Sequence, residues 1–297
     1  MPTGGRRLLH VRKAVILAAG YGTRLLPATK AQPKEALPLV DKPIIQYTVE
    51  EAAASGISQV VIVTSAGKRA VEDHFDRSFE LETTLREKGD MARLNEILQI
   101  SELADIVYVR QREQKGIGHA VLQAKDVVGD EPFALMFPDD VLVAETPVTK
   151  QMIDVFEDRG GSVIAVQEVS DADVESYGIV GGEAIGGGVV RASVLVEKPA
   201  LAEAPSRLGI VGRYVLTPEI FGILATTAPG VGREIQLTDG LATLMKSQSV
   251  FAYQFEGRRY DTGRPLGLLA AAIEIGLRRA DIGPGLRAFL RTLPLDD

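Results

Sequence analysis

Short apolar runs alternate with longer amphipathic stretches along the first half of this chain. Four of these runs have the length and composition of strands buried on both faces of a parallel sheet: residues 14–17, 58–64, 106–110 and 133–137. Between the first two, residues 43–56 predict a helix, because Pro43 suits a first helical position and Gly56 suits a stop. Alternating strands and helices predict a parallel sheet with helices on both faces.

The second half of the chain is richer in predicted strands, which we expect to merge with the first sheet. Strands are predicted over residues 162–168, 189–196 and 210–216, with a glycine-rich turn at 181–188. Further helices are predicted over residues 118–128, 238–247 and 265–279. Residues 78–99 carry many charges with apolar residues near helical spacing, which predicts a helical insertion beside the sheet, as a solvated helix pair or a subunit contact.

Composition narrows the class of protein. The 297 residues are 45% apolar and 25% charged, and we expect a short N-terminal tail over residues 1–9 and one domain over 10–297. The formal charge of −7 argues against nucleic acid as a partner. No apolar stretch is long enough to span a membrane, and the basic N-terminus lacks the apolar core of a signal peptide. Together with the absence of cysteine, this suits a cytoplasmic location.

The segment after the first predicted strand reads Ala-Ala-Gly-Tyr-Gly-Thr-Arg over residues 18–24. Gly20 and Gly22 allow a close approach of the backbone to a bound group, and successive N–H groups in such a turn can hold a phosphate. Arg24, and Lys34 ten residues later, add positive charge suited to phosphate oxygens. We therefore predict a site for a nucleotide polyphosphate rather than an ordinary glycine turn.

Two familiar phosphate-binding loops do not fit. Gly67-Lys68 is followed by Arg69 instead of the Ser or Thr of a Walker A loop, and the earlier glycine is missing. The third glycine of the dinucleotide fingerprint is replaced by Leu25. The loop thus belongs to some other class of nucleotide site.

Carboxylates are expected at the carboxyl edge of the sheet. Asp139 and Asp140 directly follow a buried strand, and Asp261 precedes a predicted helix. Ligands of open α/β sheets bind at this edge, and Mg²⁺ needs only one or two carboxylates besides phosphate and water oxygens. A turn residue for Asp140 and a helix N-cap for Asp261 are the alternatives.

The signature Gly-x-Gly-Thr-Arg, a short spacer and Pro-Lys resembles the sugar-nucleotidyltransferase family, over about residues 11–280. The run 25–35 narrows the resemblance to its bacterial uridylyl branch, which acts on UTP and glucose 1-phosphate. The resemblance implies the nucleotide-diphospho-sugar transferase fold, a Rossmann-like α/β architecture with a mixed, mainly parallel sheet. It also implies a nucleotide-binding part at about 10–145, a sugar-binding part at about 146–265 and C-terminal helices at about 265–292.

The resemblance assigns roles to individual residues. It implies catalytic roles for Arg24, Lys34, Asp139 and Asp261, with the two acids holding Mg²⁺. It implies nucleotide binding by Ala18, Ala19, Gly20, Gly22, Thr23, Glu35, Gln111 and Gly116. It implies sugar-phosphate binding by Asp140, Gly178, Glu197 and Lys198. Glu35 and Gln111 are expected at the base edge, where an amide suits uracil, and His119 is expected to have a structural role.

The implied reaction converts UTP and glucose 1-phosphate into UDP-glucose and pyrophosphate by metal-assisted direct displacement. The sugar-phosphate oxygen is already ionised at neutral pH, so alignment and charge stabilisation are expected to suffice without a general base. The resemblance also implies a homo-oligomer, either a dimer or a tetramer. A thymidylyltransferase or other sugar nucleotidyltransferase is the nearest alternative, and a non-catalytic regulatory homologue is a more distant one.

Overall fold

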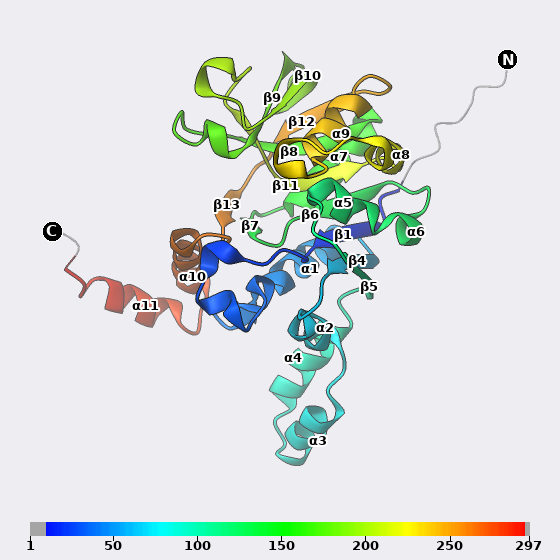
Figure 1. Ribbon diagram of the computed structural model, residues 1–297. Coiled ribbons are helices and arrows are strands. Elements are labelled where there is room, and N and C mark those ends of the chain that lie inside the picture. The colour runs from blue at the N-terminus through cyan, green and yellow to red at the C-terminus, as the bar shows by residue number, and fades with distance from the viewer. Residues whose placement is uncertain (1–9, 295–297) are drawn as a thin grey trace.

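A nine-stranded sheet is the centre of the structure, a computed structural model that describes residues 10–294 (Figure 1). Its strands, in spatial order, are β5 (Asp105–Arg110), β4 (Gln59–Thr64), β1 (Lys13–Leu17), β6 (Phe133–Met136), β11 (Leu208–Leu216), β8 (Ser162–Glu168), β12 (Val250–Gln254), β10 (Val189–Glu197) and β9 (Gly178–Ala184). Two small sheets pair β7 (Asp140–Val143) with β13 (Arg258–Asp261), and β2 (Pro38–Leu39) with β3 (Lys42–Pro43). The tail expected over residues 1–9 lies outside the described residues.

The four strands predicted in the first half form a parallel array. β1 pairs in parallel with both β4 and β6, and β4 pairs in parallel with β5. β11 then runs antiparallel to β6 and continues the sheet into the second half of the chain, where parallel and antiparallel pairs are mixed. The two halves therefore merge as predicted.

One predicted turn is shorter than expected. Gly181 and Gly182 belong to strand β9, and the turn to β10 is made by residues 186–188, which all have positive φ. A Cβ on Gly182 would lie 2.0 Å from the carbonyl oxygen of Arg191 on β10. Glycine is thus needed inside this strand because the neighbouring backbone approaches too closely for any side chain.

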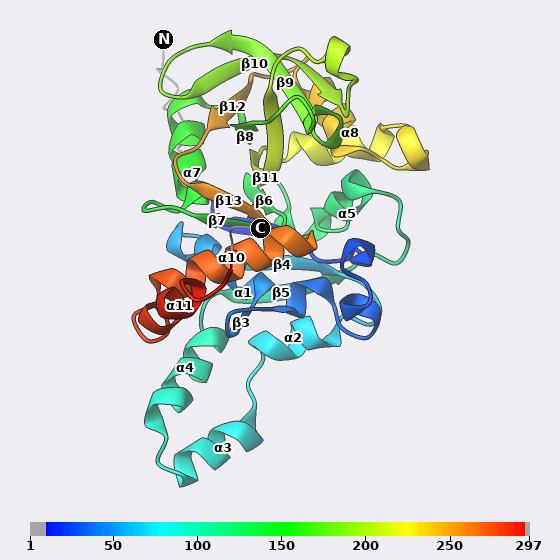
Figure 2. The same cartoon turned by 90° about the vertical axis from the view of Figure 1, so that its left-hand side faces the viewer.

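Helices cover both faces of the sheet, as the alternation of elements predicts (Figures 1 and 2). On one face Val15 and Val61 belong to a core formed with α5 (Ile117–Leu122), α8 (Glu219–Thr226) and α9 (Leu237–Leu244). On the other face Ile16 and Ile62 belong to a core formed with α1 (Ile44–Ala54), α2 (Arg69–Phe75) and α7 (Val148–Arg159). The helix predicted over 118–128 is divided into α5 and α6 (Lys125–Val128). Short 3-10 turns lie at Thr23–Leu25, Ala28–Lys30, Lys34–Ala36, Val174–Ser176, Leu201–Glu203 and Val231–Arg233.

Helices project from this body in two places (Figures 1 and 2). The predicted insertion is a hairpin of α3 (Phe79–Glu87) and α4 (Met91–Ser101), which points away from the sheet. Near the C-terminus, α10 (Pro265–Arg278) packs against the body through Ala271, and α11 (Gly283–Leu290) extends away from it; the two helices together are called the C-terminal arm. Across residues 10–294, none of the helices has both the length and the apolar character required to cross a membrane.

Candidate active site

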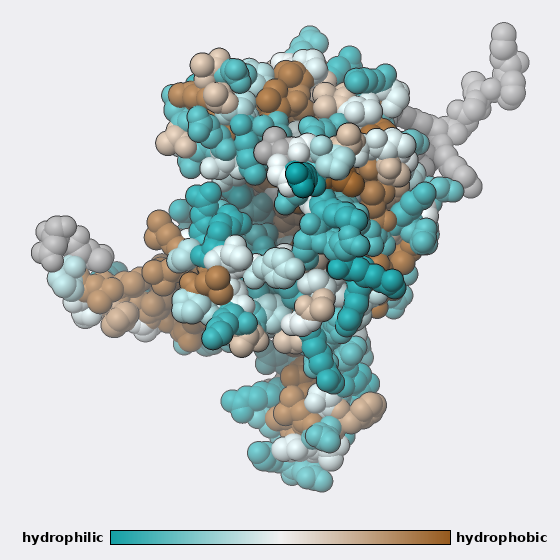
Figure 3. Space-filling view, in the orientation of Figure 1, coloured by the Kyte–Doolittle hydropathy of each residue, from teal (hydrophilic) through white to brown (hydrophobic). Residues whose placement is uncertain are grey.

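Two neighbouring cavities open at the carboxyl end of the parallel strands, in the hollow visible at the centre of Figure 3. The first cavity, of about 350 Å³, is lined by Gly20, Lys34, Gln111 and Gly116 among others. The second cavity, of about 330 Å³, is lined by residues that include Gly178, Glu197, Lys198 and Asp261. Both cavities share Arg24, Ile117, Phe137 and Asp139 in their lining. A molecule in the first cavity and one in the second therefore meet at Asp139.

The carboxylate of Asp139 lies between two cations. Lys34 Nζ donates a hydrogen bond to Asp139 Oδ2 at 2.7 Å, and Arg24 Nη2 lies 3.7 Å from the same oxygen. Burial raises the pKa of Asp139, but the Lys34 and Arg24 charges outweigh it and hold that pKa below its ordinary value. Burial likewise lowers the pKa of Lys34, and the charges of Asp139 and Glu35 more than offset this. Both partners stay charged at neutral pH.

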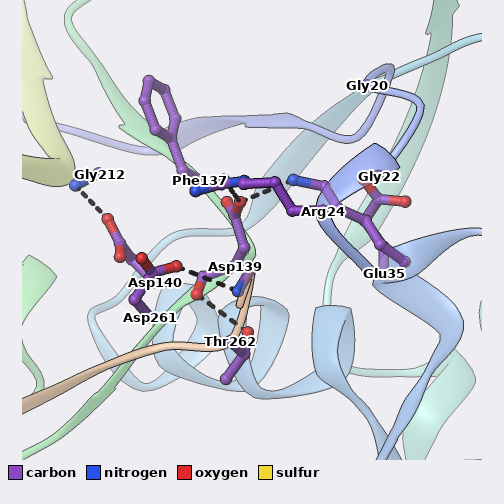
Figure 4. Close-up of polar contacts among 12 residues, drawn as sticks. Gly20, Gly22, Arg24, Glu35, Phe137, Asp139, Asp140, Gly212, Asp261 and Thr262 are labelled. Carbon is purple, nitrogen blue, oxygen red and sulfur yellow. Dashed lines mark hydrogen bonds and ion pairs between the residues drawn. The ribbon is translucent and has the colours of Figure 1, made fainter. Parts of the chain in front are cut away.

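A second acid is brought to the same place by the small sheet of β7 and β13. Asp261 lies opposite Asp140 in this antiparallel pair, and Gly263 N–H donates to Asp261 Oδ1 at 3.1 Å. Figure 4 shows Asp139 between Arg24 and Thr262, with Asp261 on the side of Asp140.

Gly263 lies close to the side chains of Asp139, Asp261 and Arg24. A Cβ on Gly263 would lie 2.8 Å from Asp139 Oδ2, 3.0 Å from Arg24 Nη2 and 3.1 Å from Asp261 Oδ1. One oxygen of each carboxylate thus lies close to Gly263, and these hard oxygen atoms are the donor type that Mg²⁺ prefers. In the described part of the chain, no group of three or more His, Cys, Asp or Glu side chains could hold a metal ion. A pair of carboxylates still fits Mg²⁺, which takes its other ligands from phosphate and water.

Asp140 is an anchor of the fold, although it also lines the second cavity. Its Oδ2 accepts from Gly212 N–H at 2.7 Å, and its Oδ1 accepts from Arg259 Nε at 2.6 Å. Burial raises the pKa of Asp140 above its ordinary value, although the charge of Arg259 acts to lower it. Arg259 also donates to the hydroxyl of Tyr177 at 2.9 Å, so it joins β13 to β7 and to the wall of the second cavity.

A buried arginine, which the sequence analysis did not single out, supports the turn that carries Asp139 and Asp140. Arg213 on β11 pairs with Glu51 at 2.8 Å, and both side chains are buried. Its guanidinium also donates to the carbonyl oxygens of Phe137, Gly212 and Asp140, each at 2.9 Å. A single arginine inside the apolar run Ile-Val-Gly-Arg-Tyr-Val-Leu is the sequence signal that could have indicated this role.

Glu197 and Lys198, at the end of β10, line the second cavity. Glu197 Oε2 accepts from the Thr238 hydroxyl at 2.6 Å, and Lys198 Nζ lies 3.7 Å from Glu197 Oε1. Gly178 pairs with Glu197 across β9 and β10, and a Cβ there would lie 3.2 Å from the Glu197 carboxylate. The side chain of Lys198 is 60% exposed, so an anion in the cavity can reach it. An acceptor carboxylate and an accessible cation together suit a sugar phosphate.

The amide of Gln111 has a fixed orientation in the first cavity. Its Nε2 donates to the carbonyl oxygen of Gly116 at 3.2 Å and lies 3.1 Å from His119 Nδ1. Because a carbonyl can only accept, the amide nitrogen must face Gly116 and the amide oxygen must face elsewhere. His119 supports this orientation from α5, in agreement with the structural role expected for it.

Most of the predicted site residues line one of the two cavities. Those that do so are Ala19, Gly20, Arg24, Lys34, Gln111, Gly116, Asp139, Asp140, Gly178, Glu197, Lys198 and Asp261. The structure does not bring Ala18, Gly22, Thr23 or Glu35 to either lining.

For three of these four residues, the structure shows why they do not line a cavity. Ala18 N–H already donates to Val63 O on β4 at 2.8 Å. Gly22 has φ of 69°, and a Cβ there would lie 3.0 Å from Lys34 Cβ. Glycine at this position therefore makes room for the side chain of Lys34. Glu35 is 1% exposed and accepts from Lys68 Nζ at 2.7 Å. Burial raises the pKa of Glu35 above its ordinary value, although the positive charges of Lys68 and Lys34 act to lower it.

Known proteins resemble this chain over most of its length. A family model for nucleotidyl transferase matches residues 13–276. The UTP–glucose-1-phosphate uridylyltransferase YngB of Bacillus subtilis (strain 168) is 53% identical over 280 residues, which is 94% of each chain. A UTP-bound UGPase from Acinetobacter baumannii has 39% identity and a TM-score of 0.89, over 96% of this chain and 100% of that one. A UDP-glucose pyrophosphorylase complexed with UDP-glucose has 43% identity and a TM-score of 0.84, over 91% and 100%.

Proposed function

The chain belongs to the nucleotidyl transferase family, and from this premise we propose that it transfers the uridylyl group of UTP to glucose 1-phosphate, with UDP-glucose and pyrophosphate as products. The activity in the names of the relatives supports this reaction, as do the UTP and UDP-glucose bound in the two similar structures. The single observation that carries the proposal within the chain is the position of Asp139. It lines both cavities, at the place where a nucleotide and a sugar phosphate would meet.

The first cavity suits UTP and the second suits glucose 1-phosphate. In the first, Arg24 and Lys34 would neutralise the triphosphate and the departing pyrophosphate. In the second, Lys198 would hold the sugar phosphate, and Glu197 would accept hydrogen bonds from sugar hydroxyls. The sugar-phosphate oxygen attacks the α-phosphorus of UTP, a new P–O bond forms, and the bond to pyrophosphate breaks. The attacking oxygen is already anionic, so the chain's task is to align it and to stabilise charge.

Enzymes of this family generally use a divalent metal ion, and here we assign Mg²⁺ to Asp139 and Asp261. The proximity of one oxygen of each carboxylate to Gly263 supports this assignment. A bound Mg²⁺ would supply positive charge to the reacting phosphates and help to orient them. Arg24, which contacts Asp139 and is half-exposed, would remain available for the phosphates.

We also propose that residues 10–297 act as one domain, that the chain forms a homo-oligomer and that it works in the cytoplasm. The continuous sheet supports a single domain, because it includes strands from both expected parts. Exposed apolar side chains on the C-terminal arm, Leu266, Leu269 and Phe289, support a subunit contact there (Figure 3). Light scattering of the wild type and of Phe289→Glu tests the contact. The cysteine-free composition and the two intracellular metabolites support the location.

The reaction is tested by mixing the protein with UTP, glucose 1-phosphate and Mg²⁺ and separating the products by chromatography. We expect UDP-glucose and pyrophosphate in equal amounts. Omission of glucose 1-phosphate is the matched control, since hydrolysis of UTP alone would also release pyrophosphate. Nucleotide hydrolysis without UDP-glucose formation would contradict the proposal.

A further inference from the structure

Lys68, which does not belong to a Walker A loop, nevertheless contacts the glycine loop of the first cavity. It precedes α2, and its side chain is 7% exposed. Its Nζ donates to the carbonyl oxygen of Gly20 at 2.6 Å and to Glu35 Oε2 at 2.7 Å. The buried ion pair of Lys68 and Glu35 is therefore attached directly to the backbone of the loop.

The neighbouring carbonyl of the loop is held in the same manner. The oxygen of Ala19 accepts from the Ser65 hydroxyl at 3.0 Å and from Gln114 Nε2 at 2.9 Å. Two successive carbonyl groups, those of Ala19 and Gly20, are thus bound by side chains from three separate positions.

These contacts determine the direction of the N–H groups in the same peptide units. In a planar trans peptide, the N–H points opposite to the C=O of the preceding residue. The bond from Lys68 to the Gly20 carbonyl therefore turns the N–H of Tyr21 away from Lys68, and the bonds to Ala19 likewise turn the N–H of Gly20. Within residues 10–294, neither of these N–H groups donates to another part of the chain.

We propose that Lys68 is a positioning residue for nucleotide binding, because its bond to the carbonyl of Gly20, which lines the first cavity, fixes the following peptide unit and holds the Tyr21 N–H as a donor to an acceptor oxygen of the nucleotide. Glu35 keeps the Lys68 ammonium in place and balances its charge. This inference rests on the proposed function, since it takes UTP as the occupant of the first cavity. Glu35 then acts on the nucleotide site through Lys68 and not by direct contact with the nucleotide.

Three variants separate positioning from simple charge balance. Glu35→Gln keeps the Lys68 bond to the loop. Lys68→Met removes that bond and leaves a buried carboxylate, so it is expected to destabilise the fold. The double variant Glu35→Gln/Lys68→Met removes both charges, which restores neutrality without restoring the bond. UTP binding is measured by calorimetry without glucose 1-phosphate, and unfolding is followed in parallel.

We expect the double variant to bind UTP about tenfold more weakly than the wild type, the loss of one well-placed donor. The affinity of Glu35→Gln for UTP should stay within about twofold of that of the wild type. The KM for glucose 1-phosphate should be unchanged in Glu35→Gln and in the double variant. Wild-type affinity in the double variant would overturn the proposal, because Lys68 would then only neutralise Glu35. An equal loss in Glu35→Gln would overturn it too.

A measurement on the wild type is independent of how the variants fold. The amide proton of Tyr21 should shift downfield when UTP is added in an NMR titration, since it gains a hydrogen bond. An unchanged Tyr21 amide in UTP-saturated protein would contradict the proposal. If the wild type binds no UTP at all, the proposed function fails, which is distinct from normal binding with an unmoved Tyr21 amide.

Discussion

Thr262 donates two hydrogen bonds to the main-chain carbonyl oxygen of Asp139, from its N–H at 2.8 Å and from its hydroxyl at 2.9 Å. Thr262 follows Asp261 directly, and its side chain is fully buried. The residue next to one acid is therefore bound to the backbone of the other, across more than a hundred positions of sequence. This contact links the two backbone segments that carry the carboxylates of the candidate site.

Thr262→Val removes the hydroxyl bond and keeps the volume of the side chain. We expect the free energy of unfolding to fall by about 1 kcal/mol, the net value of one hydrogen bond. Turnover should fall by about one to two orders of magnitude, because small displacements of reacting groups are costly. Thr262→Ser retains the hydroxyl and is the matched control. Equal turnover in the Val and Ser variants would show that the bond does not position the acids.

Asp139→Asn keeps the size of the side chain and removes the charge that Lys34 and Arg24 balance. We expect turnover to fall by about three orders of magnitude while the thermal unfolding transition is retained. Asp126→Asn is the matched control, since Asp126 is an exposed acid on α6. Steady-state rates at saturating Mg²⁺ measure the effect, and near-normal turnover in Asp139→Asn would remove Asp139 from the site.

Lys34→Ala removes the nearer of the two cations from Asp139. If Lys34 stabilises charge on the departing pyrophosphate, the loss should be about 3 kcal/mol in the activation free energy and should appear mainly in kcat. Lys30→Ala, at an exposed lysine four positions earlier, should have little effect. A raised KM for UTP with unchanged kcat would instead make Lys34 an anchor for the bound substrate.

The α3–α4 hairpin should lose an interaction in acid. Arg77 donates to both oxygens of Glu82, at 2.6 and 2.5 Å, and these bonds hold the pKa of Glu82 below its ordinary value of 4.5, although burial raises it. A carboxyl whose pKa is lowered by folding stabilises the fold fully above its unfolded-state pKa. That contribution is lost as the pH falls through the folded-state pKa.

The unfolding temperatures of the wild type and Glu82→Gln, compared at a series of pH values, measure this interaction. The wild type should be more stable by a constant margin from pH 7 down to about pH 5, and the margin should disappear in stronger acid. A margin that did not depend on pH would mean that the charge of Glu82 contributes nothing.

Elements formed by local sequence could be predicted from it, and contacts between distant segments could not. The buried strands and the glycine loop are visible in runs of a few residues, so β1, β4, β5 and β6 appear close to the expected positions. The small sheet of β7 and β13 was missed, because each of its strands is defined by pairing with a partner far along the chain.

The same reason explains the site residues that were missed or placed differently. The role of Arg259 as the partner of Asp140 can be recognised only in the structure, where β13 lies beside Asp140. Glu35 looks like a polar group of the nucleotide site in sequence, whereas the structure pairs it with Lys68 below the loop. Motifs indicate which chemistry a segment serves, but burial and pairing decide which of its side chains reach the cavity.

The account predicts selection of the base through Gln111. Its amide nitrogen faces the carbonyl of Gly116 and the ring of His119, so its oxygen remains as an acceptor for the base edge. Uracil and thymine offer an N–H donor at N3, whereas cytosine has an acceptor there, and a mismatched buried group is strongly disfavoured. The methyl group of thymine should cost about 1–3 kcal/mol, and the missing ribose hydroxyl of dTTP adds a further penalty.

Initial rates with UTP, dTTP and CTP, each with glucose 1-phosphate and Mg²⁺, test the central claim most directly. The account predicts rapid formation of UDP-glucose from UTP, a residual rate with dTTP and almost none with CTP. A faster rate with dTTP would place the chain among thymidylyltransferases, and an equal rate with CTP would contradict the role of Gln111. If UTP gave no UDP-glucose, uridylyl transfer itself would be contradicted.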